Sequence, residues 1–138
     1  MNKPANAVAK CTSSVCILVY MILLPYLEWN ASHVFNPAWP AHARFHEVWQ
    51  LCTNALLGGL ALWFVWRRSD LFTAAMITSC IMGGILLTNS LSTQLSLSVQ
   101  SDNALAPVLG MDLAVLIAVI VVATSFSSAF LTRHSKPA

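Results

Sequence analysis

The sequence contains very few charged residues. Only 9% of its 138 residues are Asp, Glu, Lys or Arg, whereas 57% are hydrophobic. A soluble domain carries roughly a quarter of charged residues, which cover its surface, so this composition excludes an ordinary soluble fold. The net charge of +2 is also too small to indicate a nucleic-acid partner. The composition therefore predicts a protein whose outer surface contacts a lipid bilayer.

Paired cysteine motifs are absent as well. All four cysteines lie in apolar stretches, and none of them forms a CxxC or CxxH pattern. Zinc sites built on thiolates use such closely spaced pairs, so a cysteine-based metal site has no support. We interpret Cys11, Cys16, Cys52 and Cys80 as small buried hydrophobic residues rather than as disulfide partners.

Four long apolar segments are present. They predict helices at about residues 11–28, 41–66, 70–89 and 108–131. Each segment has close to the roughly 20 residues that a helix needs to cross the hydrocarbon core. The first segment follows Lys3 and Lys10 as in a signal peptide, but no cleavage site with small residues comes after it, so we expect a retained helix. The predicted fold is all-α: a polytopic membrane four-helix bundle that forms a single domain over residues 1–138.

The basic residues predict the orientation of this bundle. A path of four helices puts every Lys and Arg except Arg44 on one side of the membrane. Cytoplasmic loops carry an excess of basic residues, so both termini are expected in the cytoplasm. A bacterial inner membrane is the favoured location for this multi-pass protein, and a eukaryotic endomembrane is the alternative.

Residues 36–54 carry many polar side chains for a segment that enters a membrane helix. Pro40 suits the first turn of this helix, because its missing N–H would have no partner there. Each later residue turns about 100° around the axis, so one narrow stripe forms. The stripe contains His42, His46, Trp49 and Thr53, and Glu47, Gln50 and Asn54 lie beside it. Such a helix must contact other helices or water rather than lipid.

Three further polar residues are expected at the same outer level of the bundle. They are Glu28 at the end of the first helix, Asn89 at the end of the third and Asp112 at the start of the fourth. Ionisable side chains in a membrane usually pair or line a site. We predict an outward-opening cluster of Glu28, His42, His46, Glu47 and Asp112. Neighbouring acids cannot all ionise, and a carboxyl group that keeps its proton can act as a proton donor.

Several of these residues also have a purely structural interpretation. Histidine and tryptophan are common anchors at the membrane interface. Asp112 can cap the last helix, and Asn54 can form a hydrogen bond with a neighbouring helix. The i, i+4 spacing of His42 and His46 also fits a metal pair, with Glu28, Glu47 or Asp112 completing the coordination, although the HExxH pattern is absent.

The order of elements resembles the EXPERA-domain proteins, the membrane family of the emopamil-binding sterol isomerases and the sigma-2 receptor. The similarity consists of Glu28 closing the first helix, a Pro37–Trp39 stretch before the second, Phe45 and Glu47 in its first turns, a short basic turn, and Ala106-Pro107 before the last helix. The resemblance implies a bundle around an apolar cavity, in which Glu28 and Glu47 meet a cationic centre of the ligand. His42, Arg44 and His46 depart from that pattern. Residues 39–46 also match a WPxHxxFH signature of small bacterial membrane proteins, which implies no activity.

These features predict binding of a small hydrophobic molecule such as a sterol, terpenoid, quinone or lipid. If the protein is an enzyme, the reaction would be an isomerisation or cyclisation by proton transfer, without a cofactor. Glu47, Glu28, His46 and His42 are the predicted catalytic residues. The predicted ligand-binding residues are Trp49, Gln50, Asn54, Asn89 and Asp112. One alternative is an accessory subunit of a larger membrane complex, and a second is a metal-binding protein that uses the two histidines. A homodimer fits the first prediction.

Overall fold

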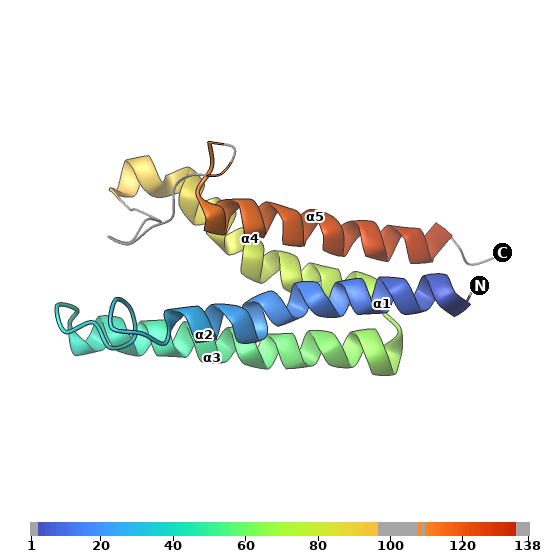
Figure 1. Ribbon diagram of the computed structural model, residues 1–138, viewed down its shortest axis with the longest axis horizontal. Helices are drawn as coiled ribbons and strands as arrows, with labels where there is room; N and C mark the ends of the chain where they lie inside the picture. The colour runs from blue at the N-terminus through green and yellow to red at the C-terminus, as the bar shows by residue number, and fades with distance from the viewer. Residues whose placement is uncertain (1–2, 97–107, 109, 135–138) are drawn as a thin grey trace.

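The computed structural model describes residues 3–96, 108 and 110–134, and its regular elements are helices without a strand (Figure 1). Helix α1 (Lys3–Leu18) continues through a π-helical turn, η1 (Val19–Leu23), into α2 (Leu24–Glu28). Helix α3 (Ala41–Trp63) ends in a second π-helical turn, η2 (Phe64–Arg68). Helices α4 (Leu71–Leu95) and α5 (Leu113–His134) follow.

Within the described residues, four helical stretches are long and apolar enough to cross a membrane. They are Asn6–Glu28, Ala41–Arg68, Leu71–Leu95 and Leu113–Thr132. The predicted all-α architecture is therefore confirmed, with four helices whose length and composition suit a membrane. The start of α1 and the end of α5 lie at the same end of the bundle, beside the turn between η2 and α4 (Figure 1). Which side of the membrane this end faces stays a prediction.

The helix boundaries differ from the apolar segments that predicted them. Helix α1 begins at Lys3 instead of about residue 11, and α4 continues to Leu95 instead of ending near residue 89. The extra turns of α4 are rich in serine and threonine, and the hydroxyl of Ser92 donates to the carbonyl of Asn89 at 2.7 Å. Hydropathy marks the part of a helix that suits lipid, whereas the helix itself continues where its polar side chains bond to its own backbone.

Pro25 explains the π-helical turn in the first spanning helix. A proline inside a helix offers no N–H, and its ring collides with the carbonyl four residues earlier. Here the turn before Pro25 is widened, and the N–H of Leu24 bonds to the carbonyl of Val19, five residues back. The helix therefore passes the proline without a break, as π-bulges allow, and carries Glu28 to its end.

A tight turn joins η2 to α4. Ser69 adopts the left-handed conformation with φ of 52°, and its N–H bonds to the carbonyl of Phe64. Asp70 then caps α4, since its Oδ1 accepts the N–H of Thr73 at 3.1 Å. As the short connection predicts, α3 and α4 form an antiparallel hairpin.

The core of the bundle lies where α1 and η1 cross the other helices. Tyr20 is completely buried there, and its hydroxyl shares a hydrogen bond of 3.3 Å with Thr78 of α4. Gly58 of α3 lies so close to η1 that an added Cβ would stand 2.7 Å from the Cβ of Met21. Gly58 thus permits contact with the first helix, whereas an added Cβ at Gly59 or Gly83 would meet nothing within 4 Å.

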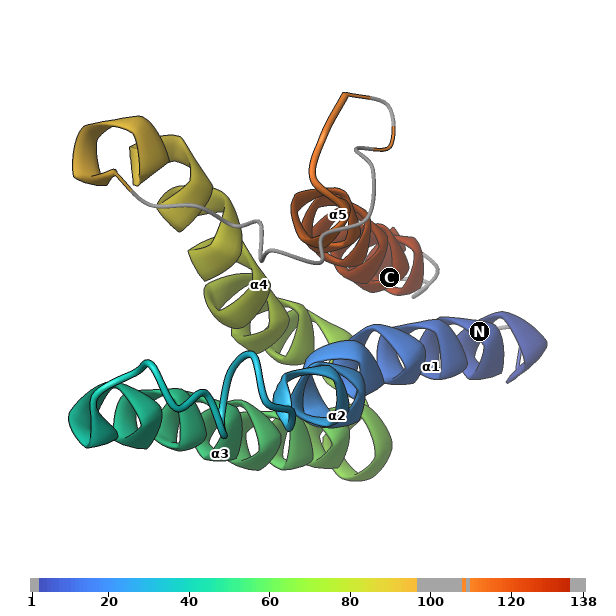
Figure 2. The same ribbon diagram turned by 60° about the vertical axis from the view of Figure 1, so that its left-hand side comes forward.

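The helices diverge at the end opposite the termini. Helix α2 packs on α3, and α4 packs most extensively on α5. The C-terminal part of α4 lies away from the N-terminal part of α3, as both views show (Figures 1 and 2). Ala106-Pro107, which carry part of the family resemblance, and Lys136, which counts toward the predicted orientation, lie outside the described residues.

Candidate functional site

A cavity of about 500 Å³ lies between α2, α3 and α4 at the diverging end of the bundle. Its polar lining comes from three separate parts of the chain. These residues are Glu28, His33, Glu47, Gln50, Asn54 and Thr88. The volume falls in the range of small-molecule sites, roughly 300–1,000 Å³.

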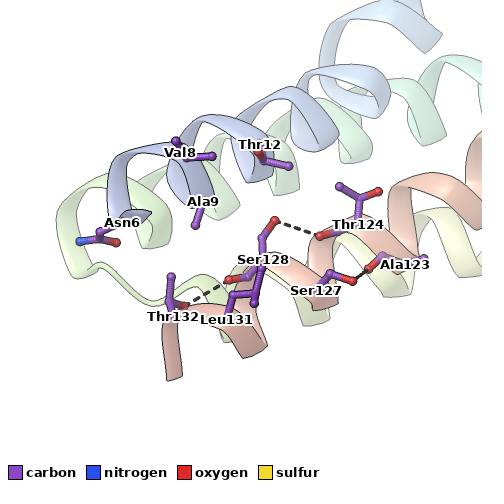
Figure 3. A pocket seen from close by; sticks show the side chains of 10 residues that line it. All are labelled: Asn6, Val8, Ala9, Thr12, Ala123, Thr124, Ser127, Ser128, Leu131 and Thr132. Carbon is purple, nitrogen blue, oxygen red and sulfur yellow. Dashed lines mark hydrogen bonds between the residues drawn. The ribbon is translucent and has the colours of Figure 1, made fainter. Parts of the chain in front are cut away.

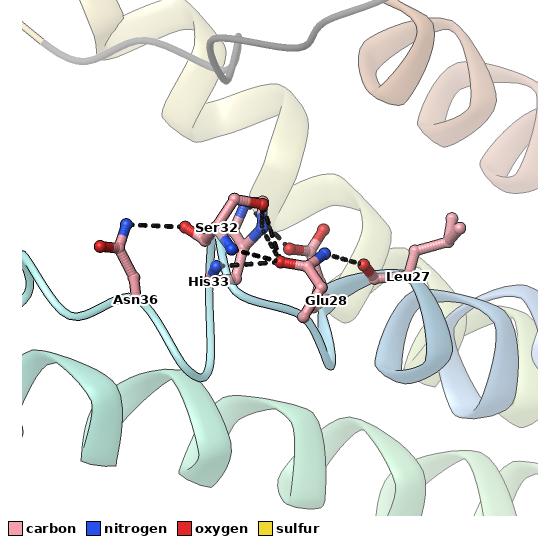
Figure 4. A network of polar contacts seen from close by, with 6 residues as sticks. Leu27, Glu28, Ser32, His33 and Asn36 are labelled. Carbon is pink, nitrogen blue, oxygen red and sulfur yellow. Dashed lines mark hydrogen bonds and ion pairs between the residues drawn. The ribbon is translucent and has the colours of Figure 1, made fainter.

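An ion pair between Glu28 and His33 forms one wall. The Nε2 atom of His33 lies 3.0 Å from the Oε2 atom of Glu28, and both side chains are about one quarter exposed. On the other side of the ring, the Ser32 hydroxyl lies 3.0 Å from Nδ1 (Figure 4). The Ser32 hydroxyl donates to Oδ1 of Asn30 at 2.7 Å, so its oxygen is placed to accept Nδ1–H of the His33 ring.

The loop that carries His33 is ordered by its own polar side chains. Asn30 accepts the N–H groups of Ser32 and His33 on its Oδ1 atom, at 2.8 and 3.1 Å. Asn36 donates to the carbonyl of Ser32 at 2.9 Å (Figure 4), and Trp39 packs against the His33 ring in a T-shaped contact. Asparagine side chains that bond to the backbone a few residues on stabilise such turns. The loop therefore holds His33 beside Glu28.

Helix α3 contributes the opposite polar wall. Glu47, Gln50 and Asn54 are three or four residues apart, and side chains at this spacing share one helix face. The carboxyl group of Glu47 can accept hydrogen bonds or exchange a proton. The two carboxamides can both donate and accept. A ligand group in this cavity would thus meet two acids, one imidazole and two carboxamides.

The remaining lining is apolar. It is formed by Leu24, Leu51, Ile81 and Ile85, with Gly84 and Ala114 completing it. The small side chains of Gly84 and Ala114 leave room on the side of α4 and α5. The cavity therefore presents both polar and apolar surface, so it suits a molecule that has a polar group on an apolar body.

The structure does not bring the predicted His42–His46–Trp49 stripe to the cavity. All three side chains are exposed, and Trp49 is 59% exposed. The reason is the helical rotation: at about 100° per residue, the stripe is centred about 120° around the axis from the face that holds Glu47 and Asn54. The prediction that the polar residues of α3 form one cluster is corrected, because they occupy two faces of the helix.

Asn89 and Asp112 also lie outside the cavity. Asn89 is exposed on α4, whereas its neighbour in sequence, Thr88, contributes to the lining. Asp112 accepts the N–H of Ala114 on Oδ1 at 2.8 Å and so caps the start of α5. The geometry therefore supports the structural role of Asp112 as a helix cap. Ligand roles for both residues stay untested predictions.

The predicted metal shell around the two histidines is not formed. Glu28 pairs with His33, and Glu47 faces the cavity instead of the exposed stripe. Within the described ranges, no group of three or more His, Cys, Asp or Glu side chains is arranged to hold an ion. The four cysteines are free; only Cys16 is buried, so the expectation of four buried thiols is wrong for the other three.

His33 is the residue that sequence reasoning missed. It follows Glu28 by five positions in the stretch Asn30-Ala31-Ser32-His33. Asparagine and serine favour turns, so a turn that folds the ring back toward Glu28 was the available signal. Periodicity gave no help, because His33 is on a loop and not on a helix.

A second hollow lies at the opposite end of the bundle, between α1 and α5 (Figure 3). It is slightly larger, about 580 Å³, and contains several hydroxyl groups. Ser127 and Ser128 bond to the carbonyls of Ala123 and Thr124 in their own helix, at 2.8 and 3.0 Å, and Thr132 does the same. These hydroxyl groups have used their only O–H donor within their own helix, so they can only accept hydrogen bonds from a ligand. Among the side chains that the structure describes, none that lines this hollow is ionisable, so the first cavity is the better candidate site.

The chain was compared with known proteins. Residues 13–127 match a family described as a family of unknown function (DUF6640). No curated protein matches the chain, and no solved structure matches it.

Proposed function

We propose that this chain, which belongs to the DUF6640 family, binds a small hydrophobic molecule in the cavity between α2, α3 and α4. The observation that carries the proposal is the combination of polar and apolar side chains in the lining of one cavity. Glu28, His33 and Glu47 contribute polar groups, whereas Ile81 and Ile85 contribute apolar surface. A ligand with an apolar body and a polar end fits this combination, because each part meets matching groups.

The acids favour a ligand whose polar end donates hydrogen bonds or carries positive charge. Glu28 and Glu47 come from different helices and line the same space. Carboxylates are acceptors, and they interact strongly with cationic donors. The EXPERA resemblance, which stays a prediction, implies the same pair of acids. A sterol, terpenoid, quinone or other lipid with such a group belongs to this class.

Proton transfer is the reaction that these groups would support. Glu47 would donate a proton to one carbon of the bound molecule. The pair of Glu28 and His33 would accept a proton from another carbon, so the net reaction would be an isomerisation. General acids and bases must lie within hydrogen-bonding reach of the atoms they serve. His33 takes the part in this scheme that the sequence assigned to His42 or His46, because its ring is at the cavity.

The test is native mass spectrometry of the protein extracted gently from its own membrane. We expect a co-purified small lipid on the wild-type protein and its loss in Glu47→Gln and Asn54→Ala. Asn89→Ala is the matched control, since this asparagine is also on a membrane helix but is exposed and outside the cavity. It should retain the lipid.

Lipid retained equally by Glu47→Gln, Asn54→Ala and Asn89→Ala would reject the cavity as the binding site. Stoichiometric protein partners without a bound lipid would instead support an accessory subunit of a larger complex. The thermal stability of each variant shows whether a loss of lipid reflects a loss of fold.

A further inference from the structure

His42 and His46 form a pair of their own on the exposed face of α3. Their Nε2 atoms are 2.9 Å apart. The two rings meet at 88°, with centroids 4.4 Å apart. Both side chains are exposed, and neither lines the cavity proposed above. The pair thus needs an explanation separate from the cavity.

The separation of the two nitrogens matches that of two ligands on one metal ion. Imidazole nitrogens bind transition metals at about 2.0–2.1 Å. Two such bonds to atoms 2.9 Å apart enclose an angle of about 90° at the metal. A right angle is typical of the square-planar or tetragonal geometry of Cu²⁺ and Ni²⁺. A tetrahedral ion would require the rings to move slightly apart.

The position of the pair on α3 makes it accessible from water. The spanning stretch Ala41–Arg68 has 28 residues, which at 1.5 Å per residue is about 42 Å long. The hydrocarbon core is only about 30 Å thick. His42 and His46 lie in the first two turns, at the end of this stretch, so they extend into the headgroup and water region.

We propose that His42 and His46 chelate one divalent transition-metal ion, with Cu²⁺ preferred. Without metal, one ring donates its Nε2–H to the Nε2 atom of the other. On binding, the donating ring shifts its proton from Nε2 to Nδ1, and both Nε2 lone pairs point to the ion. Within the described residues no third His, Cys, Asp or Glu joins the pair, so water occupies the other positions. Copper binds such nitrogen sites most tightly among the divalent first-row ions.

Cu²⁺ titration of tag-free protein in detergent tests this site, with binding followed by electron paramagnetic resonance. We expect one Cu²⁺ per chain with two nitrogen ligands. His42→Ala and His46→Ala should each weaken Cu²⁺ binding by at least about tenfold. A tenfold loss is the lower end of the effect of mutating residues that only hydrogen-bond to metal ligands. His33→Ala is the matched control, because it removes a histidine of the cavity and leaves the pair intact.

Unchanged Cu²⁺ affinity in both His42→Ala and His46→Ala would overturn the proposal, as would a spectrum without two nitrogen ligands. Loss of copper in His33→Ala, with binding retained in the other two variants, would move the metal to the cavity and overturn it as well. The result is independent of the lipid experiment, since Asn54→Ala and Glu47→Gln leave both histidines in place.

Discussion

Tyr20 shows how one polar side chain is accommodated inside the membrane-spanning part of the bundle. Its side chain is fully buried, and Thr78, which shares its hydrogen bond, is 1% exposed. A hydroxyl group buried without a partner costs free energy, so the two residues stabilise each other. This contact joins α4 to the first spanning helix at the centre of the core.

Tyr20→Phe should lower the free energy of unfolding by about 0.5–1.5 kcal/mol, which is typical of one lost hydrogen bond. Bonds between membrane helices average about 0.6 kcal/mol, so a value near the lower end is expected. Unfolding in mixed detergent micelles measures the change. Tyr26→Phe is the control, because Tyr26 is 79% exposed. Equal effects of the two substitutions would show that the buried bond does not contribute.

The contact between α3 and η1 depends on a glycine. Gly58 is buried, and a Cβ at this position would lie 2.7 and 2.8 Å from the Cβ and Cγ of Met21. The backbone of η1 fixes the Cβ of Met21, so a rotamer change can move only its Cγ away. Small residues permit such close approach between membrane helices. The neighbouring Gly59 faces open space.

Gly58→Ala should therefore destabilise the protein by about 1–3 kcal/mol, as overpacking of a core does. This value is the net effect, with the higher helix propensity of alanine already included. Gly59→Ala should be neutral or stabilising by up to about 1 kcal/mol, because alanine favours helix and meets nothing there. Thermal unfolding in detergent measures both. A second substitution, Met21→Ala, should restore part of the stability lost in Gly58→Ala. Equal effects at the two glycines would contradict the packing described here.

Charged and aromatic residues distinguish the two ends of the bundle. At the end with the termini, the Nζ atom of Lys10 donates to Ser69 Oγ at 2.9 Å and lies over the ring of Trp66. Arg68 lies over the ring of Trp63 in the same way. At the other end, Arg44 is the one basic residue between the first two spans. Basic residues beside aromatic rings are typical of a cytoplasmic interface.

We predict that Ser69 is cytoplasmic and Asn36 is on the opposite side. In a cysteine-free background, Asn36→Cys should react with a membrane-impermeant maleimide added to intact cells or sealed vesicles of matching orientation. Ser69→Cys should react only after the membrane is opened. The expectation rests on the excess of Lys and Arg at the Ser69 end. The reverse labelling pattern would show that the cavity opens toward the cytoplasm.

Much of the arrangement followed from composition and from the order of residues. The scarcity of charge and four apolar segments predicted four membrane helices, because each span needs about 20 apolar residues. The short stretch from Arg67 to Asp70 predicted the α3–α4 hairpin. Glu28, Glu47, Gln50 and Asn54 were predicted as site residues, and the structure places these four around one cavity. Their function stays a prediction.

The composition of the cavity walls depended on how the helices are rotated and folded against one another. Helical periodicity specifies which residues share a face, but not which face another helix covers. Thus Glu47 and Asn54 face α4, whereas His42 and His46 remain exposed as a pair. His33 reaches Glu28 only because Asn30 and Ser32 fold the loop back.

The sequence by itself was sufficient for the number of spans and their order, because hydropathy and length are properties of local segments. It also supplied the excess of basic residues on which the predicted orientation depends. Tertiary structure alone decided that His33 replaces the two helix histidines at the cavity. It also decided that Gly58 packs on Met21, and that Tyr20 bonds to Thr78. These contacts join residues far apart in the chain or on a loop, and their geometry depends on the rotation of whole helices, which no local pattern records.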